Sequence, residues 1–569
     1  MATLYQGTED DVSHFFHPKG INGVLVGGNL AQPSNNGLWW VPEKGGHALS
    51  FGMTRCGKGL QIIGALCQYN GSTLTIDPKG ENAWITAERR RQLGQRVVIL
   101  DPFDEVNRRY GSLVGQKEIT TRFNPLSVID PKSPDFAEDV MMLAEAVIIS
   151  SGNDPHWSES ARALVAGLIA AVIENAPPGQ ASFRQVRKLL TSTDAELTAA
   201  IKILHDRNPN SFAGRNLRRF ASGTKEVSSI RSTADTQTFP FESLRLLDSM
   251  ETDSNAFNFS SLATSRVSVF LVLPVDRLAT YGRWLRLIIT LAIRAITRAR
   301  IPPSPPVLFI LDEMGTINPG GGLRMVEQAF GLMAGMGIRI WAFLQDLKQL
   351  QHDYPNSWET FIANSELIQL LKVNDNTTSQ YFSNLIGQKE VVTEHWTEHG
   401  QMLDTSYVRQ NIKHKHYGYI HQKSAGLEMI MRPDQITQLP AQESVCIFAG
   451  GYVYHLRKIN YFSDARFRGL YRPNPLFVRR TTTEKSTVKR PTPAAPVKAS
   501  LPPVNVERVA ELGKEAAGKL SGWWKSQRAA AARAAAAREE ATQAEKRRAV
   551  ETAAMDERAR YAAMLRDAK

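Results

Sequence analysis

Cysteine is scarce in this chain of 569 residues and occurs only at positions 56, 67 and 446. Three scattered cysteines are too few for a disulfide scaffold or a cysteine-rich zinc site. The composition therefore excludes a disulfide-stabilised secreted protein and favours a reducing cytosol.

Long hydrophobic runs are also missing. The longest apolar stretches, residues 163–173 and 285–293, fall short of the roughly eighteen residues that a membrane-spanning helix needs. The N-terminal sequence M-A-T-L-Y-Q-G-T-E-D-D has neither the basic nor the apolar region of a signal peptide. The sequence predicts a cytoplasmic protein with no integral membrane segment.

Acidic residues are outnumbered, with 56 Asp and Glu against 68 Lys and Arg and a formal net charge of +12. This excess suits a polyanionic partner, but a basic tail would give the same sum. Charge alone does not distinguish nucleic acid from an anionic membrane surface.

A glycine-rich loop follows a short apolar segment at residues 46–59, which read G-H-A-L-S-F-G-M-T-R-C-G-K-G. The pattern predicts a strand over 47–51, a loop around Lys58 and a helix with apolar residues at helical spacing. Glycines let backbone N–H groups approach phosphate oxygens, and the helix N-terminus adds positive potential. The G-x-x-x-x-G-K pattern is that of a P-loop. The predicted nucleotide-binding residues are Gly52, Met53, Thr54, Arg55, Cys56, Gly57, Lys58 and Gly59.

Gly59 departs from the general P-loop signature, in which a serine or threonine after the lysine supplies a hydroxyl to magnesium. The metal must then be held by other groups. The alternative interpretation is a glycine turn that only opens an ordinary helix.

Two later strands end in polar residues. Residues 307–312, V-L-F-I-L-D, predict a buried parallel strand whose C-terminal end meets the ligand crevice of an open α/β sheet. We assign magnesium binding to Asp312 and activation of the attacking water to Glu313 as general base. A further strand over 339–344 ends in Gln345, whose amide is placed to sense the γ-phosphate.

Each of these features alone is typical of a strand end capped for solubility. Together, and in this order, they favour a P-loop NTPase that hydrolyses ATP with Mg²⁺.

The alternation of strands and helices predicts an α/β fold with a large, mostly parallel sheet. Strands over 72–76 and 96–100, separated by a helix over 82–93, indicate βαβ units. Later strands are predicted over 267–273, 367–373 and 444–449, with a helix over 282–300 and a hairpin over 452–462. The predicted domains are a β-rich lead-in (1–45), an ATPase domain (46–132 and 241–478), an all-α insertion (133–240), a flexible basic linker (479–505) and a helical tail rich in Ala, Arg and Glu (506–569).

The insertion carries basic residues that suit contact with DNA, although a solvated surface explains most such residues and phenylalanine is more often core than a stacking platform. Ser182 and Asp194 are the predicted caps of two of its helices. In the tail, Trp523 and Trp524 are the only large apolar anchors, which fits either a partner-docked helix or a solubilising tail. The basic residues of the insertion are Arg184, Arg187, Lys188, Arg215, Arg218, Arg219, Lys225 and Arg231, and they are interleaved with Phe183, Phe212 and Phe220.

With these motifs placed, the chain resembles the conjugative DNA-transfer coupling ATPases of type IV secretion systems, the TraG-like family. The matching segments follow the family order across residues 45–465. Many members of the family also have glycine after the P-loop lysine. The segments are T-R-C-G-K-G (54–59), D-P-K-G-E (77–81), R-F-N-P-L (122–126), D-P-H-W (154–157), L-V-L-P-V-D-R-L (271–278), L-D-E (311–313), Gln345 and Y-F-S-D (461–464).

The resemblance implies a RecA-like motor domain, a homo-hexameric ring with ATP between subunits, and transfer of relaxase-bound single-stranded DNA or effector proteins. It further implies secretion-channel ATPases or inner-membrane components as partners, and a peripheral position at the inner membrane. Two departures stand out. The pair of transmembrane helices usual in the family is missing, and residues 333–338 lack the arginine that some relatives direct at the neighbouring nucleotide, so such an arginine would come from Arg324, Arg339 or elsewhere in the chain.

The sequence thus predicts an ATP-hydrolysing coupling protein that recruits DNA-relaxase complexes, proteins or both to a type IV secretion system. A free cytosolic DNA translocase is one alternative. A non-enzymatic, nucleotide-stabilised substrate receptor is another, against which Glu313 argues.

Overall fold

The computed structural model describes residues 23–28, 37–43, 45–149, 155–177, 179–252, 257–316, 323–400 and 417–476, and for 393–400 and 417–424 the backbone alone. The predicted linker at 479–505 and helical tail at 506–569 lie outside these residues. Residues 1–480 form one compact unit by themselves.

One large sheet organises the described part of the chain. Its strands are β1 (Val24–Gly28), β2 (Gly37–Trp40), β3 (His47–Gly52), β4 (Thr73–Asp77), β5 (Arg96–Leu100), β6 (Val267–Val272), β7 (Val307–Leu311), β8 (Ile338–Leu344), β9 (Ser365–Lys372), β12 (Glu443–Phe448) and β13 (Tyr452–Arg457).

The strand order in this sheet is β2-β1-β13-β12-β9-β3-β8-β7-β4-β6-β5. The seven strands from β9 to β5 pair in parallel. The remaining strands extend the sheet through antiparallel pairs. The predicted α/β fold with a large, mostly parallel sheet is confirmed.

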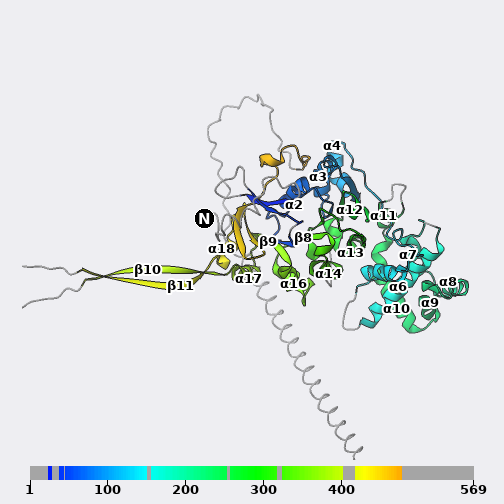
Figure 1. The fold of residues 1–569 in the computed structure, drawn as a ribbon. Helices are drawn as coiled ribbons and strands as arrows, with labels where there is room; N and C mark the ends of the chain where they lie inside the picture. Colours follow the sequence, from blue (N-terminus) through cyan, green and yellow to red (C-terminus); the bar gives the residue numbers. More distant parts are fainter. Residues whose placement is uncertain are drawn as a thin grey trace, which may run out of the picture. The chain divides into compact units, whose positions relative to one another are not determined.

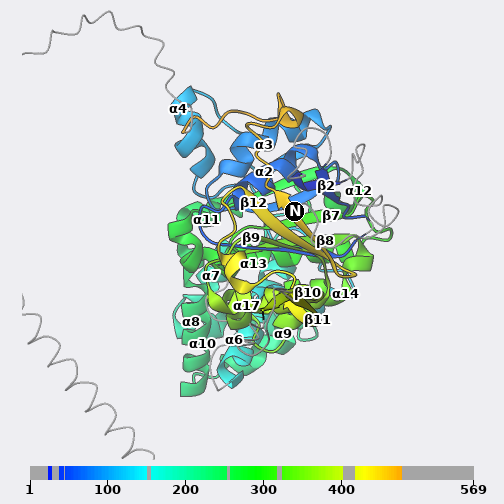
Figure 2. The same ribbon diagram turned by 90° about the vertical axis from the view of Figure 1, so that its left-hand side faces the viewer.

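Helices cover both faces of the parallel strands, which explains why strands such as β3 and β7 are buried along their whole length. Helices α2 and α3 pack on one face with Ala48 and Trp341, and the other helices pack on the opposite face with Leu49 and Phe309 (Figure 1, Figure 2). The first pair is α2 (Lys58–Gln68) and α3 (Glu81–Gln92), and the opposite group is α13 (Val275–Thr297), α14 (Arg324–Leu332), α15 (Leu347–Asp353), α16 (Trp358–Ala363), α17 (Asn376–Ile386) and α18 (Pro433–Thr437).

Between β5 and β6 the described residues contain helices and no strand. They continue past the predicted boundary at residue 240 as far as Thr264, and α6 to α10 lie together in Figure 1. The apolar faces of α5 and α6 join the core beneath α13. These elements are η1 (Asn107–Gly111), α4 (Ser112–Val114), α5 (Phe136–Val147), α6 (Pro155–Asn175), α7 (Phe183–Leu190), α8 (Asp194–Arg207), α9 (Phe212–Leu217), η2 (Arg218–Ala221), α10 (Lys225–Thr238), η3 (Phe239–Glu242), α11 (Leu244–Ser249) and α12 (Ser261–Thr264).

Three local predictions were wrong. The N-cap of α8 is Thr193 and not Asp194, because Thr193 and Glu196 form a capping box in which each side chain accepts the other's backbone N–H. Helix α13 begins at Val275, seven residues before the predicted start. The predicted hairpin over 452–462 is instead the pair β12–β13, which turns at Gly450 and Gly451, both with positive φ.

The sequence reasoning also missed a second, two-stranded sheet. Strands β10 (Gln388–Gly400) and β11 (Tyr417–Met429) pair antiparallel over their full length and are drawn as two long arrows in Figure 1. Among the described helices, none combines the length and apolarity needed to cross a bilayer.

His47, the first residue of β3, is fully buried and links three elements. Its Nδ1 accepts the backbone N–H of Ile340 at 3.1 Å, so Nε2 carries the proton and donates to the carbonyl oxygen of Ala329 at 3.1 Å. Protonation of Nδ1 would remove the atom that accepts the Ile340 N–H. Burial, assisted by the charge of Arg339, accordingly lowers the pKa of His47 to about 4.

This histidine should make stability fall in mild acid. Between pH 6.5 and 4 the unfolded chain binds a proton that the folded chain excludes, so folding stability is complete above the unfolded pKa and declines as pH falls. From pH 7 to pH 5 the loss should be about 2 kcal/mol larger in the native chain than in His47→Gln, measured by urea unfolding. Equal pH slopes for the two proteins would contradict this account of His47.

Candidate functional site

The predicted site residues lie at one edge of the sheet, where the parallel strands β3, β7 and β8 end. Strand β4 ends at the same edge. Strand β8 pairs with both β3 and β7, and β4 pairs with the far side of β7. The loop after β3 leads to Lys58, the first residue of α2. Strand β8 is followed by Gln345, β7 by Asp312 and Glu313, and β4 ends in Asp77. The carboxyl ends of parallel strands meet at one edge, where open α/β sheets bind ligands.

The side chains of Lys58, Glu313 and Gln345 are in contact at this edge. The Nζ atom of Lys58 lies 3.5 Å from Oε1 of Glu313, and Nε2 of Gln345 donates to Oε2 of Glu313 at 3.3 Å. Lys58 is only 7% exposed, so this charge lies in a low-dielectric site and not in bulk water. The lysine, glutamate and glutamine that the sequence singled out are therefore brought together.

Asp312 lies beside this group. Its Oδ1 is enclosed and has no hydrogen-bond partner among the described residues. Burial raises the pKa of the Asp312 carboxyl to about 6, the charge of Glu313 adds to the rise, and Lys58 and Lys79 oppose it. An enclosed carboxylate oxygen without a donor is a position that a cation would satisfy.

The donor set suits magnesium better than a metal held entirely by protein. Among the described residues no group of three or more His, Cys, Asp or Glu could hold a metal ion. Mg²⁺ is usually bound by one or two carboxylates together with phosphates and water. Asp312, which follows β7 at the edge of the glycine-rich loop and has one oxygen without a donor, matches that pattern.

Glu313 has an unusual backbone conformation. Its φ of 55° lies in the left-handed region, which costs a non-glycine residue about 1–3 kcal/mol and is concentrated at functional sites. The turn directly after β7 places its carboxylate between Lys58 and Gln345.

The P-loop backbone is shaped to receive an anion. Arg55 and Gly57 both have positive φ, 66° and 101°, and alternation between right- and left-handed residues turns successive N–H groups toward one concave side. Gly57 is the N-cap of α2, and within the described residues no side chain caps this helix. The N–H of Met53 donates to the carbonyl of Lys372 at 2.8 Å and fixes the start of the loop to β9.

Two glycines of the loop have different roles. A Cβ at Gly52 would lie 2.5 Å from Sγ of Cys56 and 3.0 Å from Cβ of Leu371, so the position excludes side chains. A Cβ at Gly59 would have no atom of the described chain within 4 Å. Steric exclusion therefore does not account for the missing serine or threonine.

Sequence reasoning gave no role to two charged residues near this edge. Asp77 is buried, its Oδ2 accepts the N–H of Ala83 at 2.8 Å, and burial raises its pKa to about 7. Lys79 adds positive charge beside Asp312. The sequence carried a signal for Asp77, since this aspartate ends a strand in the same way that Asp312 follows the apolar strand β7.

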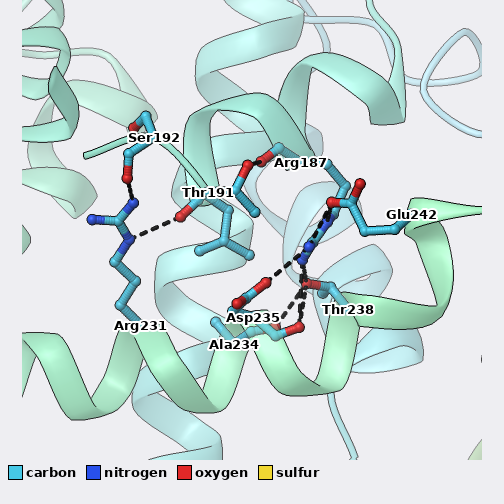
Figure 3. A network of polar contacts seen from close by, with 9 residues as sticks. Arg187, Thr191, Ser192, Arg231, Ala234, Asp235, Thr238 and Glu242 are labelled. Carbon is cyan, nitrogen blue, oxygen red and sulfur yellow. Dashed lines mark hydrogen bonds and ion pairs between the residues drawn. The ribbon is translucent and has the colours of Figure 1, made fainter. Parts of the chain in front are cut away.

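The basic residues of the insertion divide into two groups. Arg187 is 3% exposed and forms ion pairs with Asp235 at 2.8 Å and Glu242 at 2.6 Å (Figure 3). Arg231 donates to the carbonyls of Leu190 and Ser192.

Arg184 pairs with Asp248 and Glu251, so it also serves the insertion's own structure. The phenylalanines do not form an exposed platform, since Phe183 and Phe220 are buried and Phe212 is half-buried. The exposed basic residues, which form no ion pair within the described part of the chain, are Lys188, Arg215, Arg218, Arg219 and Lys225.

The two candidates for a trans-acting arginine differ in accessibility. Arg339 is buried and donates to the carbonyls of Pro42, Ala334 and Ile338, at the opposite end of β8 from Gln345. The side chain of Arg324 is 71% exposed and lies 3.5 Å from Glu145. Of these two arginines, Arg324 is the one whose side chain is exposed.

Sequence comparisons relate the chain to a known family. The family profile described as Type IV secretory system Conjugative DNA transfer matches residues 18–493. The chain is 24% identical over 393 residues to the conjugal transfer protein TraG of Rhizobium radiobacter, covering 67% of this chain and 57% of TraG. It is 24% identical over 437 residues to the protein VirD4 of Rhizobium rhizogenes, covering 75% of this chain and 60% of VirD4. The chain thus spans about three-fifths of the length of these relatives.

A solved structure shares the fold. The bacterial conjugative coupling protein TrwBdeltaN70 superposes with a TM-score of 0.54 at 17% identity, over 74% of this chain and 85% of that one. The profile match across most of the sequence, with TraG and VirD4 as relatives, shows that this chain belongs to the type IV secretory system conjugative DNA-transfer family.

Proposed function

We propose that this chain is an ATP-hydrolysing coupling protein that recruits relaxase-bound DNA, protein substrates or both to a type IV secretion system and helps to power their transfer. The observation that carries the proposal is the contact of Glu313 with both Lys58 and Gln345, beside the enclosed carboxylate of Asp312. These are the kinds of group that phosphoryl transfer to water uses: a lysine and a metal-binding carboxylate for the phosphates, and a second carboxylate to activate the water.

Each residue has a distinct task in the proposed reaction. Lys58 and the N–H groups of the P-loop hold the β- and γ-phosphates, and Glu313 accepts a proton from the attacking water. Asp312 would hold Mg²⁺, which neutralises charge on the phosphate oxygens when bound. Gln345 directly follows β8 and donates to Glu313. Through this contact, the presence or absence of the γ-phosphate would be communicated to β8.

The ion pair between Lys58 and Glu313 suggests how hydrolysis is restrained without nucleotide. The Lys58 ammonium lies 3.5 Å from the Glu313 carboxylate, and this ion pair engages the carboxylate that would otherwise accept a proton from water. Triphosphate oxygens would compete for Lys58, and Glu313 would then be released to act on water.

Related structures support the choice of cofactors. TrwB has been solved in complex with ADP and Mg²⁺, and with a non-hydrolysable ATP analogue. We extend ATP and Mg²⁺ to this chain because its own P-loop and Asp312 fit both groups.

Single-stranded DNA is the proposed nucleic-acid partner, and its contacts would include the exposed basic residues of the insertion. Arg218 and Arg219 lie side by side on η2, with Arg215 one turn earlier on α9. A homo-hexamer with exposed Arg324 directed at a neighbouring subunit is the proposed assembly. Secretion-channel ATPases or inner-membrane components would hold it at the membrane.

Substitutions at the site should separate binding from hydrolysis. Lys58→Ala should abolish DNA-stimulated ATPase activity and weaken ATP binding, because it removes the cation for the phosphates. Glu313→Gln should bind ATP normally but lose roughly 10²–10⁴-fold in kcat, because only the base is missing. Steady-state phosphate release and fluorescent-nucleotide binding measure the two effects.

Lys202→Ala is the matched control, because this lysine is exposed on α8, a helix of the insertion, and not at the sheet edge that carries the site. All variants should keep the native unfolding midpoint. Full activity in a folded Lys58→Ala variant would exclude the proposed active site, and negligible turnover of the native chain with and without DNA would favour the non-enzymatic receptor.

Replacing both Arg218 and Arg219 by alanine should weaken binding of single-stranded DNA and reduce its salt dependence. If each arginine contacts one phosphate, the slope of log Kobs against log salt should drop by about 1.4. Arg187→Ala provides the contrast, because loss of its buried ion pairs should lower stability and leave the salt slope unchanged. Fluorescence anisotropy from low to moderate salt measures both, and an unchanged slope in the double variant would remove this surface from the DNA path.

Partner capture distinguishes the coupling protein from a free translocase. The tagged chain, expressed in a host that carries its own secretion genes, should retain a relaxase or a secretion-channel ATPase after crosslinking. Mass spectrometry identifies both. Recovery of neither, with DNA-stimulated ATPase intact, would favour the free translocase.

A further inference from the structure

Lys458 is a buried cation that contacts the P-loop from a distant part of the chain. It directly follows β13 and is 9% exposed. Its Nζ donates to the carbonyl oxygen of Cys56 at 2.9 Å and to that of Ala441 at 3.1 Å. Its own N–H donates to the carbonyl of Gln442 at 2.7 Å, which fixes the backbone from which the side chain extends.

We propose that Lys458 is a positioning residue for nucleotide binding, which holds the Cys56 carbonyl outward so that the following N–H groups of the P-loop face the phosphates. The inference rests on the proposed function, since it assumes that the P-loop binds a nucleoside triphosphate.

The geometry of the peptide group supplies the first reason. In a planar trans peptide the carbonyl of one residue and the N–H of the next point in opposite directions. A donor that fixes the Cys56 carbonyl therefore also fixes the direction of the Gly57 N–H. This is the turn where Arg55 and Gly57 take left-handed conformations.

Electrostatics supplies the second reason. A carbonyl oxygen turned toward a phosphate would repel it, whereas an ammonium on the outer side neutralises that oxygen and adds positive potential to the loop. Burial lowers the pKa of Lys458 to about 8, with the charge of Lys372 contributing and the Cys56 thiol opposing. The protonated amine thus predominates at pH 7.

Packing supplies the third reason. A Cβ built on Gly57 would lie 3.8 Å from Cδ of Lys458, so the aliphatic stem lies against the same turn that its ammonium holds. Lys458 thereby couples the β12–β13 end of the sheet to the P-loop. Movement of that hairpin would be transmitted to the phosphate site.

The test compares variants of the full chain. Lys458→Met keeps the stem and removes the donor, and Lys458→Arg restores charge and donors. We expect Lys458→Met to weaken binding of fluorescent ATP and to raise KM roughly tenfold or more, because a charge-assisted hydrogen bond is lost. Its kcat should change by less than about threefold, because Glu313 and Asp312 are untouched, and Lys458→Arg should recover most of the affinity.

Two controls make the result specific. Lys372→Met removes a neighbouring cation that does not bond the Cys56 carbonyl, and it should leave KM close to the native value. Lys458→Gln, which lacks both the charge and the reach, is a second loss variant and should raise KM as Lys458→Met does. Urea unfolding should show every variant folded under the assay conditions, with lower midpoints for the two loss variants because two carbonyl oxygens lose their donor.

The outcomes separate the two proposals. Failure of the native chain to bind ATP would overturn the proposed function and this inference with it. Native ATP binding combined with unchanged KM in both loss variants would overturn only the role of Lys458. An equal rise of KM in Lys372→Met, or no recovery in Lys458→Arg, would attribute the effect to net charge or local packing and would likewise overturn it.

Discussion

The site depends on the parallel pairing of β8 with both β3 and β7. Because all three strands run in the same direction, the groups that follow them meet at one edge of the sheet. The P-loop lysine, the carboxylates after β7 and the glutamine after β8 are thereby brought within a few ångströms although they are far apart in the chain. Reversal of any one strand would carry its polar group to the opposite edge, where Arg339 lies.

The same pairing explains the composition of the strands. A central parallel strand is covered on both faces, so β3, β7 and β8 are buried throughout and mostly apolar until they reach the edge. Charged groups at that edge are therefore partly desolvated. This raises the pKa of Asp77 and Asp312 and places Lys58 where a polyanion would be its most favourable partner.

The antiparallel strands at the other end of the sheet contribute to the site as well as to its stability. Strands β12 and β13 deliver Lys458 to the back of the P-loop, so the loop is held from two sides: by β9 at Met53 and by Lys458 at Cys56. The residues after Lys458 continue over α3, where the N–H of Arg472 donates to the carbonyl of Ile85 and Asn474 donates to Glu81. The Cys67 thiol of α2 also donates to the carbonyl of Leu470, so the C-terminal part of the described chain is fastened to both α2 and α3.

The sequence by itself determined the elements with local signals: the P-loop, the apolar strand that precedes Asp312 and Glu313, and the helices of the insertion, because glycine spacing, apolar runs and periodicity act over a few residues. Only the tertiary structure decided which charges are shared. Arg187 and Arg218 look alike in sequence, yet one is buried with Asp235 and Glu242 and the other is exposed, because the packing of α7 against α10 and η3 sets their surroundings. Likewise nothing local marks Lys458, whose partner Cys56 lies 402 positions away. A hydrogen bond across that distance exists only after the sheet has assembled.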